Sequence, residues 1–129
     1  MSKPTNGELE ILRVLWKDGP SSVRFVNEQL SADRTIGYTT TLKLMQIMHD
    51  KGFLSRTRSG KTHIYRADVT EEETQQQLVD RLLDTAFSGS AMKLVMQALG
   101  NRRSSPEELA EIRQFLDQLE SDQSESTKS

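Results

Sequence analysis

Short polar side chains and one cation share one side of a segment that has helical periodicity. At about 100° per residue, Thr39, Lys43 and Gln46 lie together, and Thr40 lies at their flank. Hydroxyl, ammonium and amide groups on a helix are the donors and acceptors that hydrogen-bond to base edges in the major groove of DNA. The pattern therefore favours base recognition. The alternative is that the threonines only start a helix, as hydroxyl residues do in many proteins.

A cluster of positive charge follows this segment. Residues 51–66 contain five Lys or Arg and no Asp or Glu, and their pattern predicts a short β-hairpin after Gly52. We expect Arg56, Arg58 and Lys61 to project to solvent, where such cations bind phosphate groups and supply affinity without sequence information. Taken alone, the same stretch also fits an ordinary solvated hairpin.

Three helices are expected to hold these groups in place. Residues 5–8, Thr-Asn-Gly-Glu, have the spacing of a capping box, which predicts the start of a first helix. Ser21 or Ser22 can cap a second, shorter helix. The third helix is expected near residues 39–51, and it ends at Gly52, which suits the left-handed position that follows a helix.

One side of the third helix is expected to pack on the first two helices, and the hairpin is expected to lean on all three. Ile64 is the strand residue expected to face inward. The fold class that follows is mainly α with a small β-hairpin, namely a winged helix-turn-helix followed by a helical tail. The inward side of the third helix carries Thr41, Leu44, Met45 and Met48.

Charge is distributed unevenly along the 129 residues. The formal net charge is only −2, yet residues 1–69 carry eleven Lys or Arg and seven Asp or Glu, whereas residues 70–129 carry six and twelve. The first part thus has a net charge of +4 and the second part −6. A polyanion is therefore the expected partner of the first part alone.

Composition excludes several classes of protein. The chain has no cysteine, which excludes disulfides and thiolate catalysis, and its two histidines are too few for a strong metal site. We expect no metal and no cofactor. Because there is no phosphate-binding glycine loop and no pair of acids in an apolar setting, no enzyme activity is expected. The lack of a long apolar run and of a signal peptide predicts a cytoplasmic protein without membrane insertion.

The second part of the sequence predicts three more helices. Residues 70–73 have the pattern of a capped start, residues 88–90 (Ser-Gly-Ser) interrupt the helix, and Ser105-Pro106 starts the last one. Such short helices cannot close a core alone, so we expect them to interlock with those of a second copy. The alternative is that they fold back on the first part as a monomer.

These patterns divide the chain into three parts. We expect a winged-helix DNA-binding domain at residues 1–69, a helical dimerisation domain at 70–120 and a disordered tail at 121–129. The residues expected at the dimer interface are apolar and recur at helical spacing. They are Leu78, Leu82, Leu83, Leu94, Val95, Leu99, Leu109, Ile112, Phe115 and Leu116.

Three motifs occur in a fixed order: Tyr38-Thr-Thr-Thr, then Met45-Gln-Ile-Met-His-Asp-Lys-Gly-Phe53, then a hairpin that closes on Tyr65. Their order and spacing resemble the penicillinase-repressor family of winged-helix regulators, also called the BlaI/MecI/CopY family. The resemblance extends over roughly residues 5–120. It implies a homodimer that binds a palindromic operator in double-stranded DNA and represses transcription. Lys43 and the two threonines before it fall where the family's recognition helix meets DNA.

The resemblance also implies a trigger. In the β-lactam-responsive branch, a membrane sensor metalloprotease is the implied partner and the tail is cleaved, which releases the repressor from DNA. The cut lies in a helix that corresponds here to residues 92–99, but the Asn-Phe pair expected there is absent. The copper-responsive branch uses cysteines near its C-terminus, so copper sensing of that type is excluded. Leu42 stands where some members carry a basic residue, so the operator need not match theirs.

A different class of function fits the same fold. Winged helices also serve as protein-interaction modules that make no specific contact with DNA. Such a module is the alternative to the repressor.

Overall fold

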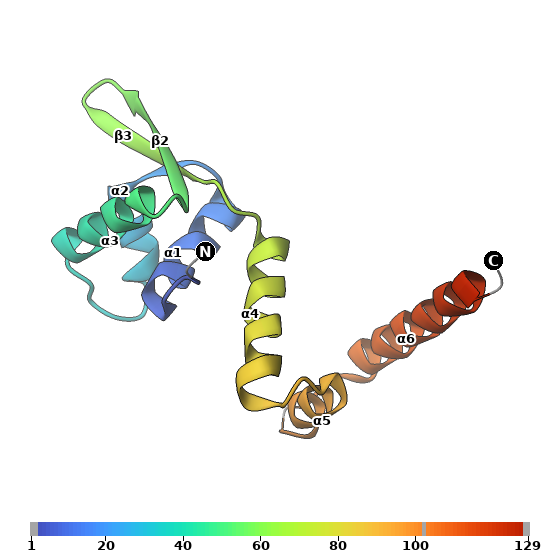
Figure 1. Cartoon of the computed structure of the whole chain (residues 1–129). Coiled ribbons are helices and arrows are strands. Elements are labelled where there is room, and N and C mark those ends of the chain that lie inside the picture. The colour runs from blue at the N-terminus through green and yellow to red at the C-terminus, as the bar shows by residue number, and fades with distance from the viewer. Residues whose placement is uncertain (1–2, 102, 128–129) are drawn as a thin grey trace. The chain divides into compact units, whose positions relative to one another are not determined.

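Six helices and three short strands follow one another along the described part of the chain (Figure 1). The computed structural model describes residues 3–101 and 103–127, and it divides into two compact units, Met1–Leu82 and Leu83–Ser129. Because α4 begins in the first unit and ends in the second, the division lies later than the boundary predicted after Val69. The first unit contains α1 (Asn6–Asp18), β1 (Ser21–Ser22), α2 (Val23–Leu30), α3 (Tyr38–Asp50), β2 (Leu54–Ser59), β3 (Thr62–Ala67) and the start of α4 (Glu71–Ala86). The second contains the end of α4, α5 (Ala91–Asn101) and α6 (Pro106–Thr127).

The predicted caps of the first two helices are confirmed. The Thr5 hydroxyl accepts a hydrogen bond from the Glu8 backbone N–H at 3.3 Å, and the Glu8 carboxylate accepts one from the Thr5 N–H at 2.9 Å. This reciprocal pair satisfies two donors that the first turn of a helix leaves free. Ser22 caps α2, since its hydroxyl accepts from the Phe25 N–H at 3.1 Å.

The hairpin is part of a three-stranded sheet in the order β1-β3-β2. The structure corrects the expectation that Ile64 faces inward, because Tyr65 is 1% exposed and Ile64 is only half-buried. Opposite residues of an antiparallel pair point to the same face, and Tyr65 shares a face with Ala67, which pairs with the buried Leu54. The side chains of β3 that face the helices are therefore those of Tyr65 and Ala67, and Ile64 lies on the opposite face of the sheet.

The core of the first unit lies between α1, α2, α3 and the base of the hairpin. As predicted, Thr41, Met45 and Met48 of α3 are buried and Leu44 is half-buried. The Thr41 hydroxyl accepts a hydrogen bond from the Asn27 side chain at 2.9 Å, so α2 holds α3 through a polar contact as well. The buried apolar residues are Ile11, Leu12, Leu15, Val23, Val26, Met45, Met48, Phe53, Leu54 and Tyr65.

An ion pair between a buried carboxylate and a partly exposed ammonium joins the start of α1 to the end of α3. Glu8 is 1% exposed, and the Lys51 ammonium lies 2.9 Å from one carboxylate oxygen and 3.2 Å from the other. Burial raises the pKa of the Glu8 carboxyl, but the Thr5 backbone N–H and the Lys51 ammonium lower it by more, so the net shift of the pKa is downward. The carboxylate is therefore charged at neutral pH, and the Lys51 ammonium pairs with it within the fold instead of being free to bind a ligand.

The end of α3 has the geometry that Gly52 predicted. Gly52 has φ of +88°, its N–H donates to the His49 carbonyl at 3.1 Å, and the Phe53 N–H donates to the Met48 carbonyl at 2.9 Å. These two bonds form a Schellman motif, which ends the helix and turns the chain into β2.

Gly52→Ala is expected to lower the free energy of unfolding by about 1 kcal/mol, because only the left-handed backbone opposes a side chain there. A Cβ at Gly52 would meet no atom within 4 Å, so steric overlap contributes nothing. Gly7→Ala is the control, since Gly7 lies within α1 and its Cβ would make an ordinary contact with Leu44 at 3.7 Å. Chemical denaturation should show opposite signs for the two variants, and equal losses would contradict the assignment.

The three predicted helices of the tail are all present. Thr70, Ser90 and Ser105 cap them, with hydroxyl oxygens that accept from the backbone N–H three residues later at 3.0 to 3.2 Å. The prediction of disorder from residue 121 differs from the structure, in which α6 continues to Thr127. No Gly or Pro ends the helix before that point, and the Gln118 side chain donates to Asp122 one turn later. Residues 128 and 129 lie outside the described residues.

Apolar side chains of the tail remain uncovered. Within the described part of the chain, α5 has no buried residue, and the only buried residue of α4 is Thr74. Of the ten residues predicted for a dimer interface, six are half-buried: Leu78, Leu83, Leu94, Leu99, Leu109 and Ile112. The other four are exposed: Leu82, Val95, Phe115 and Leu116. Four further apolar residues are also exposed: Val79, Met92, Met96 and Leu119.

Candidate nucleic-acid interface

The outward side of α3 presents the four residues that the sequence singled out. Thr39, Thr40, Lys43 and Gln46 are all exposed. The N-cap of α3 is Gly37, and no side chain caps this helix. The threonines therefore do not cap α3, although Thr39 and Thr40 lie in its first turn, as the alternative also expects, and both are exposed.

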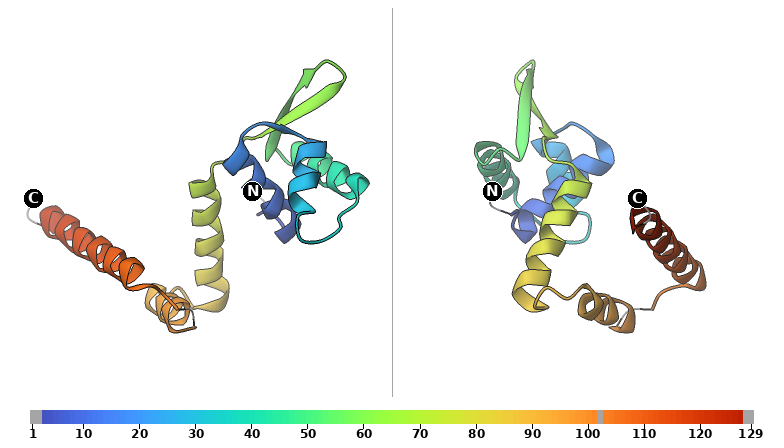
Figure 2. Two further views of the ribbon diagram at one scale, coloured as in Figure 1. Left: turned by 180° about the vertical axis from the view of Figure 1, so that it is seen from behind. Right: turned by 45° about the vertical axis from the view of Figure 1, so that its right-hand side comes forward.

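A groove separates α3 from the hairpin. It holds about 560 Å³, and side chains from α2, α3, β2 and β3 line it. Gln46 lies on the α3 wall, and Arg56 and Lys61 lie on the hairpin side, so the structure brings these three predicted residues together. Thr39, Thr40 and Lys43 lie outside the lining, on the adjacent surface of α3. In both Figure 1 and Figure 2 the hairpin projects beyond the helices of this unit.

The strand register explains why the charged side chain of Arg56 on the hairpin faces the groove. Arg56 pairs with Tyr65, and Arg58 pairs with His63. These residues share the face that, nearer the base of the hairpin, buries Leu54 in the core. Toward the tip the same face has no core to cover, so Arg56 and His63 line the groove instead. Arg58 lies outside the lining, and its Nε donates to the Gly60 carbonyl at 3.0 Å.

Not all cations of residues 51–66 are available to a ligand. Lys51 pairs with Glu8 at 2.9 Å, and Arg66 pairs with Asp68 at 3.5 Å. The remaining three, Arg56, Arg58 and Lys61, are exposed and have no carboxylate partner within the described residues. The three cations that the sequence predicted as phosphate contacts are therefore the three that the fold leaves unpaired.

The structure adds lining residues that sequence reasoning missed. Arg24, near the start of α2, contributes a third cation to the groove, and Tyr38 and His63 contribute rings. Arg24 reaches this place because β1 pairs with β3 and so brings the start of α2 to the hairpin. A two-residue strand such as β1 leaves no periodic pattern in a sequence, so no local signal could have found Arg24.

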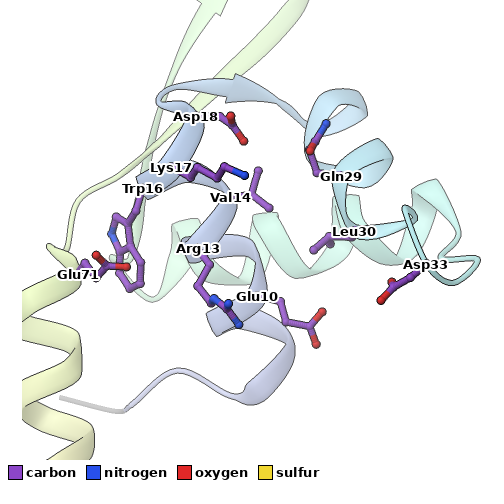
Figure 3. Close-up of a pocket in the computed structure, with 10 residues that line it drawn as sticks. All are labelled: Glu10, Arg13, Val14, Trp16, Lys17, Asp18, Gln29, Leu30, Asp33 and Glu71. Carbon is purple, nitrogen blue, oxygen red and sulfur yellow. The ribbon is translucent and has the colours of Figure 1, made fainter. Parts of the chain in front are cut away.

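A second groove of about 600 Å³ runs along the outer surface of α1 (Figure 3). It lies between the side chains of α2 and the first turn of α4, with Arg13, Val14, Trp16 and Lys17 presented by α1. Four carboxylates exceed its two cations, which gives the lining a net charge of −2. Such a groove repels phosphate, whereas the groove beside α3 has three cations and no carboxylate. The acids of the α1 groove are Glu10, Asp18, Asp33 and Glu71.

Two further observations bear on the class of protein. Across residues 3–101 and 103–127, none of the helices is both long and apolar enough to cross a membrane. In the same ranges, no three His, Asp or Glu side chains are grouped so that they could hold a metal ion.

Comparison with known proteins identifies relatives over nearly the whole chain. The family model described as penicillinase repressor matches residues 4–118. The transcriptional regulator BlaI of Mycobacterium tuberculosis is 31% identical over 125 residues, which cover 93% of this chain and 89% of that protein. The penicillinase repressor of Bacillus licheniformis is 25% identical over 114 residues, which cover 88% of this chain and 89% of that protein.

Solved structures agree on the fold. A MarR family protein from Bacillus stearothermophilus aligns with a TM-score of 0.53 at 18% identity, covering 95% of this chain and 77% of that one. A transcriptional regulator from Thermotoga maritima aligns with a TM-score of 0.52 at 16% identity, covering 97% and 80%. These likenesses confirm a mainly helical winged-helix fold. The match of the family model and the 31% identity to the Mycobacterium tuberculosis regulator establish that the chain belongs to the penicillinase repressor (BlaI/MecI) family of transcriptional repressors and is not an enzyme.

Proposed function

We propose that this chain represses transcription as a homodimer in which each winged helix binds one half of a palindromic operator. The observation that carries the proposal is the groove beside α3, with three cations, no carboxylate and an adjacent row of exposed polar groups. In this arrangement Arg56, Arg58 and Lys61 hold the phosphate backbone, and Thr39, Thr40, Lys43 and Gln46 read base edges.

The tail supports dimerisation. Phe115 is 63% exposed, Met96 62% and Met92 72%, which are large values for apolar side chains of a soluble protein. In the dimer, residues 70–120 of a second copy would cover these exposed apolar side chains. Two-fold symmetry would then set the half-sites a whole number of helical turns apart.

Release from DNA is proposed to follow proteolysis of the C-terminal region by a membrane sensor metalloprotease. Support comes from family membership alone. Because an Asn-Phe pair is absent, the cut would fall on a different sequence. A shortened chain in induced cells supports this step, and derepression with the chain intact would contradict it.

Salt-dependent binding to duplex DNA tests the proposal. The logarithm of affinity should fall linearly with the logarithm of salt concentration, because each neutralised phosphate releases a counterion. Arg56→Ala and Lys61→Ala should each reduce the slope by about 1 and weaken binding to all duplexes alike. Arg13→Ala is the matched control, since Arg13 lines the acidic groove along α1, and its slope should equal that of the wild type. If the wild type binds no duplex even at about 50 mM salt, the repressor proposal fails and a role as a protein-interaction module takes its place.

A further inference from the structure

The two sides of the groove beside α3 differ in chemistry. The α3 side presents Tyr38, Leu42 and Gln46, which follow one another at intervals of four residues and so form a single uncharged stripe. The opposite side presents the cations Arg24 and Arg56, together with Lys61 of the turn. One side is therefore apolar with a terminal amide, and the other is positively charged.

A strand of duplex DNA has a matching asymmetry. Its phosphates carry the negative charge, and its base edges in the major groove carry hydrogen-bonding groups and the methyl group of thymine. A strand that lies along the groove with its phosphates toward the cations presents its base edges to α3. The stripe of Tyr38, Leu42 and Gln46 is then the surface that meets the bases.

Tyr38 is the apolar member of this stripe that does not pack against the core. Its side chain is 49% exposed, whereas Leu42 is half-buried and packs against the core. A large aromatic ring in the first turn of α3 lines the same groove as three cations and gives it an exposed apolar surface. Apolar contact with the C5-methyl group distinguishes thymine from the other bases, and a Gln amide suits adenine.

We infer that Tyr38, supported by Leu42, contacts thymine methyl groups, so that the operator carries A·T pairs where the groove side of α3 meets it. This inference rests on the proposed function, because it requires that α3 enters the major groove. It gives the groove a role in choosing sequence, in addition to the role of Thr39, Thr40 and Lys43 on the adjacent surface.

Replacement of thymine by uracil tests the contact directly. A duplex is first selected from a random pool by the full-length chain, and each thymine is then changed to uracil in turn, which removes one methyl group and keeps the base pairing. At one or two positions affinity should fall about fourfold, the loss expected for one methyl group taken out of an apolar contact. The same uracil duplexes are then measured with Tyr38→Ala, Tyr38→Phe and Ile47→Ala.

The three variants distinguish the contribution of the Tyr38 ring to binding from the contributions of its hydroxyl and of the rest of α3. Tyr38→Ala should bind thymine and uracil duplexes equally, whereas Tyr38→Phe should keep the fourfold difference because it keeps the ring. Ile47→Ala, which removes an apolar side chain of α3 that is 36% exposed and outside the groove, should also keep it. Circular dichroism and thermal unfolding establish that each variant is folded.

The outcomes distinguish the inference from the function on which it rests. The inference is overturned if uracil costs nothing at any position, if the cost persists in Tyr38→Ala, or if Tyr38→Phe behaves like Tyr38→Ala. The last result would assign the contact to the hydroxyl and the phosphate backbone. In all three cases salt-dependent binding of the selected duplex would leave the repressor proposal standing. If no duplex is bound at all, the proposed function fails, and the inference fails with it.

Discussion

Phe115→Glu and Leu116→Glu, introduced together into the full-length chain, are expected to reduce affinity for a palindromic operator by roughly 10²- to 10⁴-fold. This range is the gain that linking two binding modules gives over one, and it is lost when the link is broken. The first unit should remain folded, because these two side chains lie on α6, in the second unit, and are 63% and 51% exposed. A helix tolerates glutamate well, so α6 should also persist.

The physical reason is the desolvation of charge. In the proposed dimer the two apolar side chains are covered by a second copy, and a carboxylate in their place would be buried without a partner. The dimer then dissociates, while each monomer retains its own contacts. Affinity for a duplex with a single half-site should be unchanged.

Gln114→Glu is the control, because it adds a carboxylate, one of the two that the double variant adds, at an exposed polar position of α6. Sedimentation velocity should show a dimer for the wild type and for Gln114→Glu, and a monomer for the double variant. A wild type that sediments as a monomer would contradict the dimer, and so would a double variant that still sediments as one.

The second large effect concerns the free energy of unfolding. Lys51→Met is expected to lower it by about 2 kcal/mol, because the change keeps the aliphatic stem and leaves the Glu8 carboxylate buried without its cation. Loss of one partner of a fully buried pair costs more, but the Lys51 side chain is 33% exposed and solvent screens part of the interaction. Urea denaturation measures the difference.

This effect should depend on pH in one direction. Since the pKa of Glu8 in the folded protein lies below its ordinary value of 4.5, the ion pair contributes fully above that value, and the contribution is lost as pH falls through the lowered pKa. The difference between wild type and Lys51→Met should therefore be constant near neutral pH and shrink in acid.

Arg34→Ala provides the comparison for the ion pair. It breaks the Arg34–Glu10 pair, whose side chains are 54% and 37% exposed, and should cost less than about 1 kcal/mol. If Lys51→Met costs no more than Arg34→Ala, or if its cost grows in acid, the Glu8–Lys51 pair does not stabilise the fold in the way proposed.

The sequence could predict the elements of this fold because their signals are local. The capping box at residues 5–8, the glycine that ends α3 and the serine caps of the tail each involve residues a few positions apart. The buried side of α3 follows from spacing alone, because a helix repeats its contacts every three or four residues.

The features that could not be predicted depend on distant partners. Glu8 and Lys51 are 43 positions apart, so nothing near Lys51 shows that its charge is already paired. The inward parity of β3 is set by the pairing of Leu54 with Ala67, and a six-residue strand with mixed polarity does not reveal it. Arg24 enters the groove only through the two-residue strand that precedes α2. The sequence thus predicted the cations and polar groups of the candidate site, but not the other residues that line its groove.

Chemical-shift mapping by NMR with a selected operator duplex tests the central claim most directly, namely that DNA lies against α3 and the hairpin. Amide signals of residues 38–46 and 56–63 are predicted to shift on addition of the duplex. Signals of α1 residues that line the acidic groove, such as Arg13 and Lys17, are predicted to stay in place. Shifts concentrated along α1, or no shifts in α3 and the hairpin while the duplex is bound, would contradict the account.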